Sequence, residues 1–186
     1  RNTAGSLFSC LLSKQKRKYH RDNMDSQELR NELIKNNIEF EEVFHKAVYT
    51  SLEGHMLSLP HSEAEAKNLF LKSKKSFVLM TVKGDKRVDL KAMAKELGYS
   101  SFSFAKEDDL LTLLSLTPGS VTPMGLLNDK ERRVVFYLDS EFKDSLIYVH
   151  PMENTSSLLL SSNDLYHFLS SQGIKCNWID IKTKEA

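Results

Sequence analysis

The chain has few of the residue patterns that mark metal, redox or cofactor-dependent proteins. It contains 2 cysteines, Cys10 and Cys176, which lie far apart and outside any paired redox or zinc spacing. A disulfide scaffold or a zinc site is therefore not expected, and Cys176 is interpreted as a buried strand residue. The 6 histidines form no His-Glu-x-x-His arrangement, and the sequence lacks glycine-rich phosphate loops, dinucleotide fingerprints and nucleophile elbows. We expect neither a metal ion nor a cofactor.

Long apolar runs are also missing, and none approaches the ~20 residues of a membrane span. No stretch reads as an export signal, so we expect a cytoplasmic protein that does not contact a membrane. The net charge of +1 argues against a protein that coats nucleic acid indiscriminately. With 40% hydrophobic and 27% charged residues among 186, the composition is that of an ordinary domain with enough chain to bury a core.

Residues 1–23 differ from the rest of the chain. Residues 1–21 carry 6 Lys and Arg residues and no acid, and most of this charge follows the short apolar stretch 7–12, whereas a signal peptide has its charge before the apolar run. A transit sequence, a nuclear-type basic cluster and a non-native leader all remain open, and a leader or an appended extension is favoured. One domain is then expected over residues 24–186.

The apolar periodicity beyond residue 23 alternates between helical and strand spacing. Helices are expected at 26–36, 90–97, 106–114 and 163–172, and strands at 38–45, 67–72, 77–82, 101–104, 134–138, 146–149, 156–160 and 176–181. Residues 46–66 are ambiguous, with a possible helix at 52–59 that Pro60 ends. The polar turn at 73–76 indicates a hairpin. We therefore expect an α+β fold with a curled, barrel-like mixed β-sheet flanked by helices.

The segment from Leu116 to Asp129 uses 2 of the 7 glycines and 2 of the 4 prolines. Proline fixes φ and glycine permits geometries that a Cβ forbids, so a stiff loop with exposed backbone is predicted. Backbone N–H groups near Gly119 could stabilise a developing oxyanion. A tight connection between a helix and a strand is the alternative.

Other polar candidates lie on loops and strand ends: Lys67 with Asn68, and His150 with Asn154 and Thr155. His150 precedes a proline and follows an apolar strand, so its ring is expected to donate or accept hydrogen bonds freely. Taken singly, each of these residues has an ordinary structural explanation. From Lys67 to Lys95 there are also 9 basic residues and 2 acids, a block that could meet a phosphate backbone or form solvated edges of strands and a helix.

Five blocks in the same order resemble the YbaK/prolyl-tRNA synthetase-associated domain family, and within it the stand-alone prolyl-tRNA editing proteins. The resemblance covers about residues 24–181, and its blocks are 67–72, 84–90, 116–123, 125–129 and 150–155. It implies a single editing domain that hydrolyses alanine mischarged onto proline tRNA. Its partners would be the acceptor end of the mischarged tRNA and, as a further candidate, prolyl-tRNA synthetase.

The resemblance also implies roles for individual residues. The catalytic set would be Lys67, Gly119 and His150. Substrate would be bound by Asn68, Ser120, Val121, Thr122, Pro123, Met124, Asn154 and Thr155. The basic block, rather than the resemblance, supplies the residues expected to bind tRNA, which are Lys72, Lys74, Lys75, Lys86 and Arg87.

An aminoacyl ester lies beside a ribose hydroxyl, so such a protein needs no nucleophile of its own and works by holding the ester and excluding the larger proline. Met124 stands where the family has an aromatic residue, and Thr155 begins a slightly altered continuation of the histidine block, so both bear on pocket size. A non-catalytic module that binds tRNA or a synthetase, and a deacylase for cysteinyl or another small aminoacyl-tRNA, are the alternatives.

Overall fold

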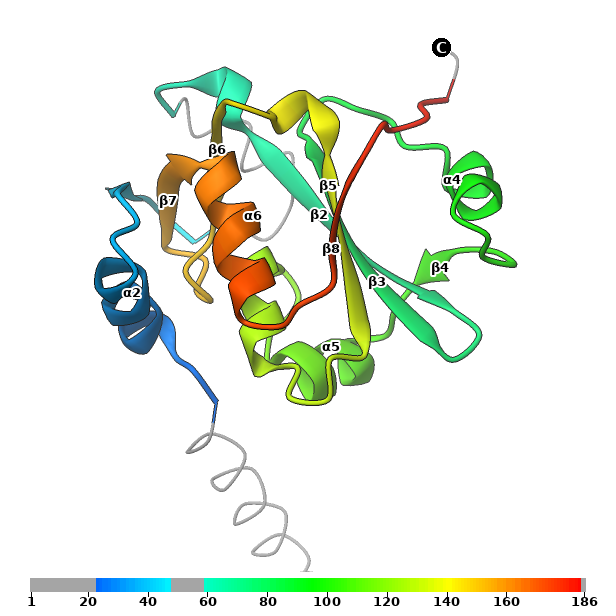
Figure 1. Cartoon of the computed structure of the whole chain (residues 1–186), viewed down its shortest axis with the longest axis horizontal. Helices are drawn as coiled ribbons and strands as arrows, with labels where there is room; N and C mark the ends of the chain where they lie inside the picture. The colour runs from blue at the N-terminus through cyan, green and yellow to red at the C-terminus, as the bar shows by residue number, and fades with distance from the viewer. Residues whose placement is uncertain (1–22, 48–58, 185–186) are drawn as a thin grey trace, which may run out of the picture.

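A computed structural model of the chain describes residues 23–47 and 59–184 (Figure 1). Every helix and strand expected within these ranges is present, with ends that differ by at most two residues from the expected ones. The possible helix at 52–59 and the basic extension fall almost entirely outside the described residues. The elements are α2 (Ser26–Lys35), β1 (Phe40–Phe44), η1 (Ser62–Ala64), β2 (Ala66–Ser73), β3 (Ser76–Lys83), α4 (Leu90–Glu96), β4 (Ser103–Phe104), α5 (Glu107–Leu114), η2 (Pro123–Asn128), β5 (Val134–Asp139), η3 (Ser140–Phe142), β6 (Leu146–Val149), β7 (Ser156–Ser161), α6 (Ser162–Ser171) and β8 (Cys176–Ile179), where η denotes a 3-10 helix.

The α+β class is confirmed, but the strands form two sheets rather than one barrel-like sheet. A mixed sheet has the order β4-β2-β3-β5-β8, and an antiparallel sheet has the order β1-β7-β6. The expected hairpin of β2 and β3 is present, whereas β5 runs parallel to both β3 and β8. Parallel neighbours require crossover connections, which here run over the faces of the sheet. The edge strands β4 and β8 are not paired with each other, so the five-stranded sheet is open.

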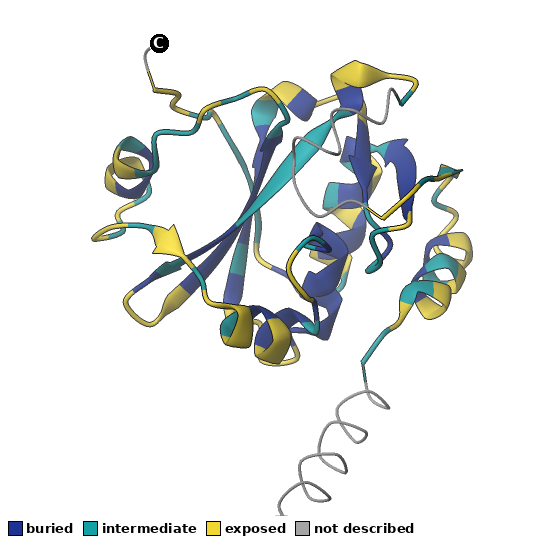
Figure 2. Ribbon diagram, turned by 180° about the vertical axis from the view of Figure 1, so that it is seen from behind, coloured by how far each residue is buried: buried dark blue, intermediate teal, exposed yellow. Residues whose placement is uncertain are grey.

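Strand alternation divides the core between the two faces of the five-stranded sheet. One face carries side chains such as Leu79 and Phe136, which pack against α5, η2, α6 and the three-stranded sheet. The other face carries side chains such as Met80 and packs against Met93 of α4. Figure 2 shows the result, with buried central strands and helices whose outer sides are exposed. No helix in the described ranges is both long enough and apolar enough to cross a membrane.

Local sequence signals explain where several helices begin and end. The Asp25 side chain accepts hydrogen bonds from the backbone N–H groups of Gln27 and Glu28, and the Glu28 carboxylate accepts one from the Asp25 backbone N–H, which forms the capping box that starts α2. At their carboxyl ends, α4 and α6 are followed by Gly98 (φ 75°) and Gly173 (φ 78°). This left-handed geometry costs glycine little, so both helices end where the glycine stands.

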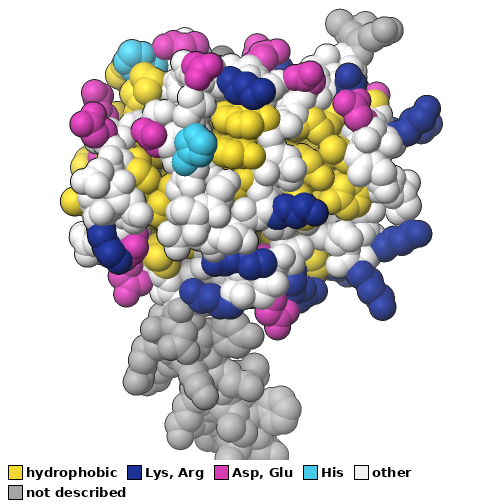
Figure 3. All heavy atoms as spheres, viewed as in Figure 1, with side chains coloured by type: hydrophobic (Ala, Val, Ile, Leu, Met, Phe, Trp, Pro, Cys, Tyr) yellow, Lys and Arg dark blue, Asp and Glu magenta, His cyan; other side chains and the backbone are white. Residues whose placement is uncertain are grey.

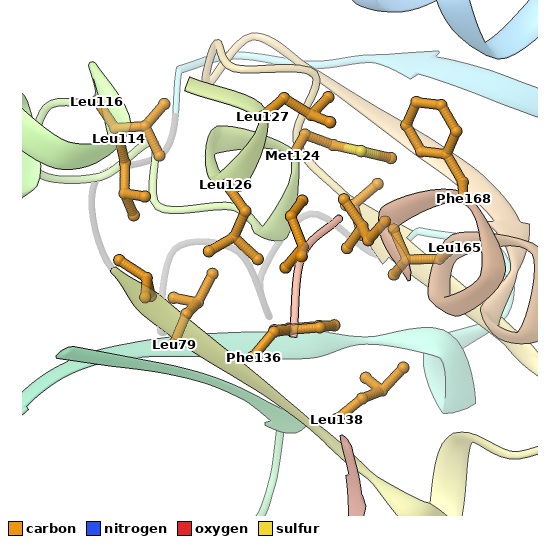
Figure 4. Close-up of a cluster of buried hydrophobic side chains, with 14 of the residues drawn as sticks. Leu79, Leu114, Leu116, Met124, Leu126, Leu127, Phe136, Leu138, Leu165 and Phe168 are labelled. Atoms are coloured by element: carbon orange, nitrogen blue, oxygen red, sulfur yellow. The ribbon is translucent and has the colours of Figure 1, made fainter. Parts of the chain in front are cut away.

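The loop at 116–129 is only partly as expected. Gly119 has φ 86°, which agrees with a constrained turn. The second half, however, is the helix η2, whose six residues are all buried, so the prediction of an exposed backbone is wrong there. The cause is the apolar sequence that follows Pro123. Met124 and Leu126 are both 0% exposed and fill the space between α5, α6 and the five-stranded sheet (Figure 4).

Candidate active site

The first contact that builds the candidate site is made by Asn68 on β2. Its Oδ1 accepts a hydrogen bond of 2.6 Å from the hydroxyl of Thr81 on β3, and its Nδ2 donates one of 2.8 Å to the backbone oxygen of Val121. Thr81 is fully buried, and its hydrogen bond fixes the orientation of the Asn68 side-chain amide. Asn68 therefore fastens the loop that precedes η2 to the five-stranded sheet.

Thr122 makes the second contact, which joins this loop to the one after β6. Its hydroxyl donates a 2.7 Å hydrogen bond to the backbone oxygen of His150 and also accepts one from the backbone N–H of Met124, where it caps η2. Thr122 is fully buried. Four of the residues that the resemblance implied, Asn68, Val121, Thr122 and His150, are thus joined by hydrogen bonds although they lie in three separate blocks of the sequence.

His150 is partly buried at the end of β6. Its Nδ1 lies 3.0 Å from the backbone oxygen of Ser156 and 3.4 Å from the hydroxyl of Ser157, both on β7. Burial lowers the pKa of His150 from its ordinary value of 6.5, and the nearby ring of His45 lowers it further, against the opposing effect of the Ser156 backbone. The imidazole is therefore neutral near pH 7.

The turn that contains Gly119 is closed by Ser120 rather than opened towards a ligand. The hydroxyl and the backbone N–H of Ser120 donate to the backbone oxygen of Thr117 at 2.8 and 3.1 Å, and the hydroxyl accepts from the Thr117 N–H at 3.2 Å. Ser120 is 6% exposed. Its polar groups are occupied within the turn, so it holds the shape of the loop and does not offer a free hydroxyl.

Lys67 lies on the opposite face of the sheet from Asn68, as adjacent residues of a strand must. It pairs with Val82, whose side chain belongs to the cluster beneath α4, and its Nζ donates to the backbone oxygen of Lys86. Burial lowers the pKa of Lys67, and the charge of Asp85 opposes this shift. The structure therefore does not bring the Lys67 ammonium group together with the Asn68 and His150 contacts.

The remaining residues of the expected substrate set are spread between core and surface. Pro123 and Met124 are buried, and the Met124 side chain packs with Leu126 and Leu127 in the core (Figure 4). Asn154 is partly buried, whereas Thr155 is exposed and accepts a 2.9 Å hydrogen bond from the His45 backbone N–H through its own backbone oxygen.

The basic block separates into neutralised and exposed groups. Lys86 forms ion pairs of 2.7 Å with Asp139, which is fully buried, and of 2.9 Å with Glu141. Lys72 pairs with Asp109 at 3.1 Å. Of the other expected tRNA contacts, Lys74, Lys75 and Arg87 are exposed. Figure 3 shows Lys and Arg side chains along the right and lower edges of one face, the side on which α4 and the β2–β3 hairpin lie in Figure 1.

Several residues near the site carried no recognisable signal in the sequence. His45, at the end of β1, has its ring centre 5.9 Å from that of His150. Arg30 of α2 forms 2.6 Å ion pairs with Glu42 and with Glu153, and the latter fixes the loop after β6 to α2. These partners are 12 and 123 residues from Arg30. Only the tertiary fold reveals such pairs, because neither spacing belongs to a motif.

In the described part of the chain, no group of three or more His, Cys, Asp or Glu residues is placed to hold a metal ion. The polar groups at the site are instead a neutral imidazole, amides and hydroxyls. Such groups can orient a polar substrate and supply or accept hydrogen bonds, but they include no activated nucleophile.

Comparison with known proteins gives consistent results. The aminoacyl-tRNA editing domain family matches residues 45–168. The prolyl-tRNA editing protein ProX of Acetoanaerobium sticklandii is 34% identical over 132 residues, covering 69% of this chain and 80% of ProX. The prolyl-tRNA synthetase associated domain-containing protein 1 of Bos taurus is 38% identical over 144 residues, covering 73% of this chain and 83% of that protein.

Among solved structures, a candidate trans-editing enzyme for prolyl-tRNA synthetase superposes with a TM-score of 0.60 at 20% identity. The superposition covers 78% of this chain and 87% of that one. At this level of identity the likeness shows that the fold is shared.

Proposed function

The chain belongs to the aminoacyl-tRNA editing domain family, and from this premise we propose that it is a trans-editing deacylase that hydrolyses the ester of alanine mischarged onto tRNA(Pro). The observation that carries the proposal is the 34% identity to a prolyl-tRNA editing protein over 80% of that protein's length. The chemistry would be hydrolysis of a carboxylic ester, with the mischarged tRNA as substrate and prolyl-tRNA synthetase as a candidate partner.

The geometry of the two loops supports a mechanism by positioning. Asn68 and Thr122 hold the backbone at Val121 and His150 through hydrogen bonds of 2.8 and 2.7 Å, so the loops need not reorganise when a substrate arrives. An aminoacyl ester is activated and lies beside a ribose hydroxyl. Binding it in one orientation therefore supplies much of the rate enhancement without a covalent enzyme intermediate.

We assign His150 the task of orienting the amino group of the ester or the attacking water. A neutral imidazole can accept a hydrogen bond from either, whereas a charged imidazolium would repel the ammonium group of the amino acid. The lowered pKa of His150 keeps it neutral near pH 7, which suits this task. Backbone N–H groups near Gly119, other than that of Ser120, which donates to the backbone oxygen of Thr117, are the proposed donors to the ester carbonyl.

Lys67 is proposed to act on the tRNA rather than on the reacting carbonyl. Its Nζ lies on the α4 side of β2, bound to the Lys86 backbone oxygen, while the Asn68 contacts lie on the η2 side. A phosphate of the acceptor end could compete for this ammonium group, since it offers a charged acceptor in place of a neutral one. Loss of Lys67 should then weaken substrate binding and reduce its dependence on salt.

Exclusion of proline is the proposed basis of specificity. A synthetase cannot strongly reject a smaller side chain, because one methylene is worth only about 1–3 kcal/mol, so a second site that admits only the smaller one is needed. Val121 is the proposed position at which a smaller side chain would enlarge the pocket, because Met124 is buried in the core. Val121→Ala should let the protein attack prolyl-tRNA(Pro), and an unchanged preference would count against the sieve.

The deciding experiment measures release of labelled alanine from alanyl-tRNA(Pro), beside prolyl-tRNA(Pro) and cysteinyl-tRNA(Pro). Wild type, Lys67→Ala and Asn68→Ala are compared, with Lys91→Ala as control because Lys91 is an exposed lysine of the same basic block. We expect loss of alanine alone, a raised KM in Lys67→Ala, a lowered kcat in Asn68→Ala, and no change in Lys91→Ala.

Two other outcomes would replace the proposal. Faster release of cysteine than of alanine would make the chain a cysteinyl-tRNA deacylase of the same family. Stable esters with tRNA still bound would make it a binding module that contacts tRNA through the block from Lys67 to Lys95.

A further inference from the structure

We propose that His45 and Ser157 are positioning residues that hold His150 in the tautomer with a hydrogen on Nδ1 and a free electron pair on Nε2. The three side chains form one directed chain of hydrogen bonds that runs from the end of β1 through β7 to the end of β6. The catalytic consequence rests on the proposed function, but the tautomer itself can be measured without any substrate.

The direction of the chain begins at His45. Its Nδ1 lies 2.9 Å from the backbone oxygen of Lys46, which can only accept, so Nδ1 carries the hydrogen. In the neutral ring, Nε2 is then an acceptor. Its partner at 2.9 Å is the hydroxyl of Ser157, which must therefore donate.

The hydrogen bonds keep the same direction from Ser157 to His150. Its hydroxyl hydrogen points to His45, so its oxygen presents electron pairs, and it lies 3.4 Å from Nδ1 of His150. The same Nδ1 lies 3.0 Å from the backbone oxygen of Ser156, a second group that can only accept. Two acceptors on one nitrogen require a hydrogen there, and a neutral imidazole then has none on Nε2.

The burial of Ser157 gives this chain of hydrogen bonds an energetic consequence. Ser157 is 3% exposed, so water does not readily replace His45 as the acceptor of its hydroxyl hydrogen. Without His45, the hydroxyl hydrogen could turn towards the Nδ1 electron pair of the opposite His150 tautomer, 3.4 Å away, in competition with the hydrogen bond from Nδ1–H to the Ser156 backbone oxygen. His45 thus biases a choice between two tautomers of the His150 ring. Only the Nδ1–H form leaves Nε2 able to accept a hydrogen from the substrate amino group or from water.

The test begins with nitrogen NMR of the histidine rings in the full chain at neutral pH. Wild type should show His150 and His45 with a hydrogen on Nδ1 and none on Nε2. His45→Phe keeps the ring volume but removes the acceptor and should shift His150 towards the Nε2–H form, whereas His45→Gln retains an acceptor and should preserve the wild-type tautomer. His167→Phe is the matched control, because His167 is exposed on α6.

Kinetics on alanyl-tRNA(Pro) provides the second readout. His45→Phe and Ser157→Ala should each lower kcat by about 2- to 12-fold, the effect of one neutral hydrogen bond, with little change in KM. His45→Gln should restore most of the loss. Thermal melting of each variant separates these effects from unfolding.

Three results would overturn the inference: an Nε2–H form of His150 in wild type, no change of tautomer in His45→Phe, or equal kcat losses in His45→Phe and His45→Gln. The first two need no substrate. If the wild-type chain hydrolyses none of the esters, the proposed function fails while the tautomer assignment is still decided.

Discussion

Close packing around Gly125 leaves no room for a side chain at this position. A Cβ added at this position would lie 2.5 Å from Cδ1 and 3.1 Å from Cγ of Leu116, and 3.3 Å from Cβ of Leu114. Its φ is not positive, so alanine suits the backbone conformation there. The space, not the conformation, therefore excludes a side chain. Gly125 also lies in η2, directly after the loop that Asn68 and Thr122 hold.

The expected cost of Gly125→Ala follows from two opposing terms. Overpacking a close-packed core costs about 1–3 kcal/mol. Replacing glycine by alanine where no strain arises would instead stabilise by about 0.4–1 kcal/mol through the unfolded chain. Leu116 is 2% exposed and cannot move into solvent, so overpacking should win. The melting temperature should fall by about 2–10 °C for a chain of this size.

Urea and thermal unfolding followed by circular dichroism would measure this cost. Gly84→Ala is the matched control, because its added Cβ would meet Glu65 no closer than 3.4 Å and its φ is not positive. In a double-mutant cycle, Leu116→Ala removes the atoms that clash, so Gly125→Ala should cost little in that background. Unchanged or raised stability of Gly125→Ala alone, or an equal cost in both backgrounds, would refute the reasoning.

Three further predictions concern the surroundings of the site. Arg30→Met should cost about 1–3 kcal/mol in urea unfolding, because it leaves the Glu42 carboxylate unpaired where its side chain is only 16% exposed; an unchanged midpoint would contradict this. Because the pKa of His150 is lowered in the folded state, the unfolded state binds more protons as the pH falls below 6.5, so stability should decrease there, and less so in His150→Gln; identical slopes would exclude the buried imidazole as the cause. Lys74 and Lys75 are exposed, so their double replacement by alanine should reduce the slope of log tRNA affinity against log salt by about 1.4–1.8, and an unchanged slope would remove the hairpin from the tRNA interface.

The parts of the candidate site could be predicted from the sequence to different degrees. Asn68, Thr122 and His150 lie in blocks that resemble a known family, and the structure joins them through hydrogen bonds to backbone oxygens. Such contacts could not be predicted, because Thr122 uses the backbone of His150 and not its side chain. Lys67 shows the opposite case, in which residues adjacent in the sequence are separated by the fold. Adjacent residues look like one motif in the sequence, but strand alternation points Lys67 and Asn68 to opposite faces.

The partners of His150 and Arg30 were not predictable from the sequence. His45 stands 105 residues before His150, and nothing in its sequence neighbourhood distinguishes it from an ordinary residue at a strand end. Glu153 is likewise paired only because α2 lies beside the loop after β6. Contacts of this kind depend on how the two sheets stack, which local pattern does not encode.

The amino-acid sequence by itself determined the helices, the strands, the hairpin and the α+β class, because apolar periodicity, helix caps and glycine stops act over a few residues. It did not determine that the strands divide into two sheets, that η2 is buried, or that the hydrogen bonds of Lys67 and Asn68 lie on different faces of the sheet. Only the tertiary structure decided these, since they depend on parallel strand pairing and on burial between distant segments, whose free energy no short stretch of sequence contains.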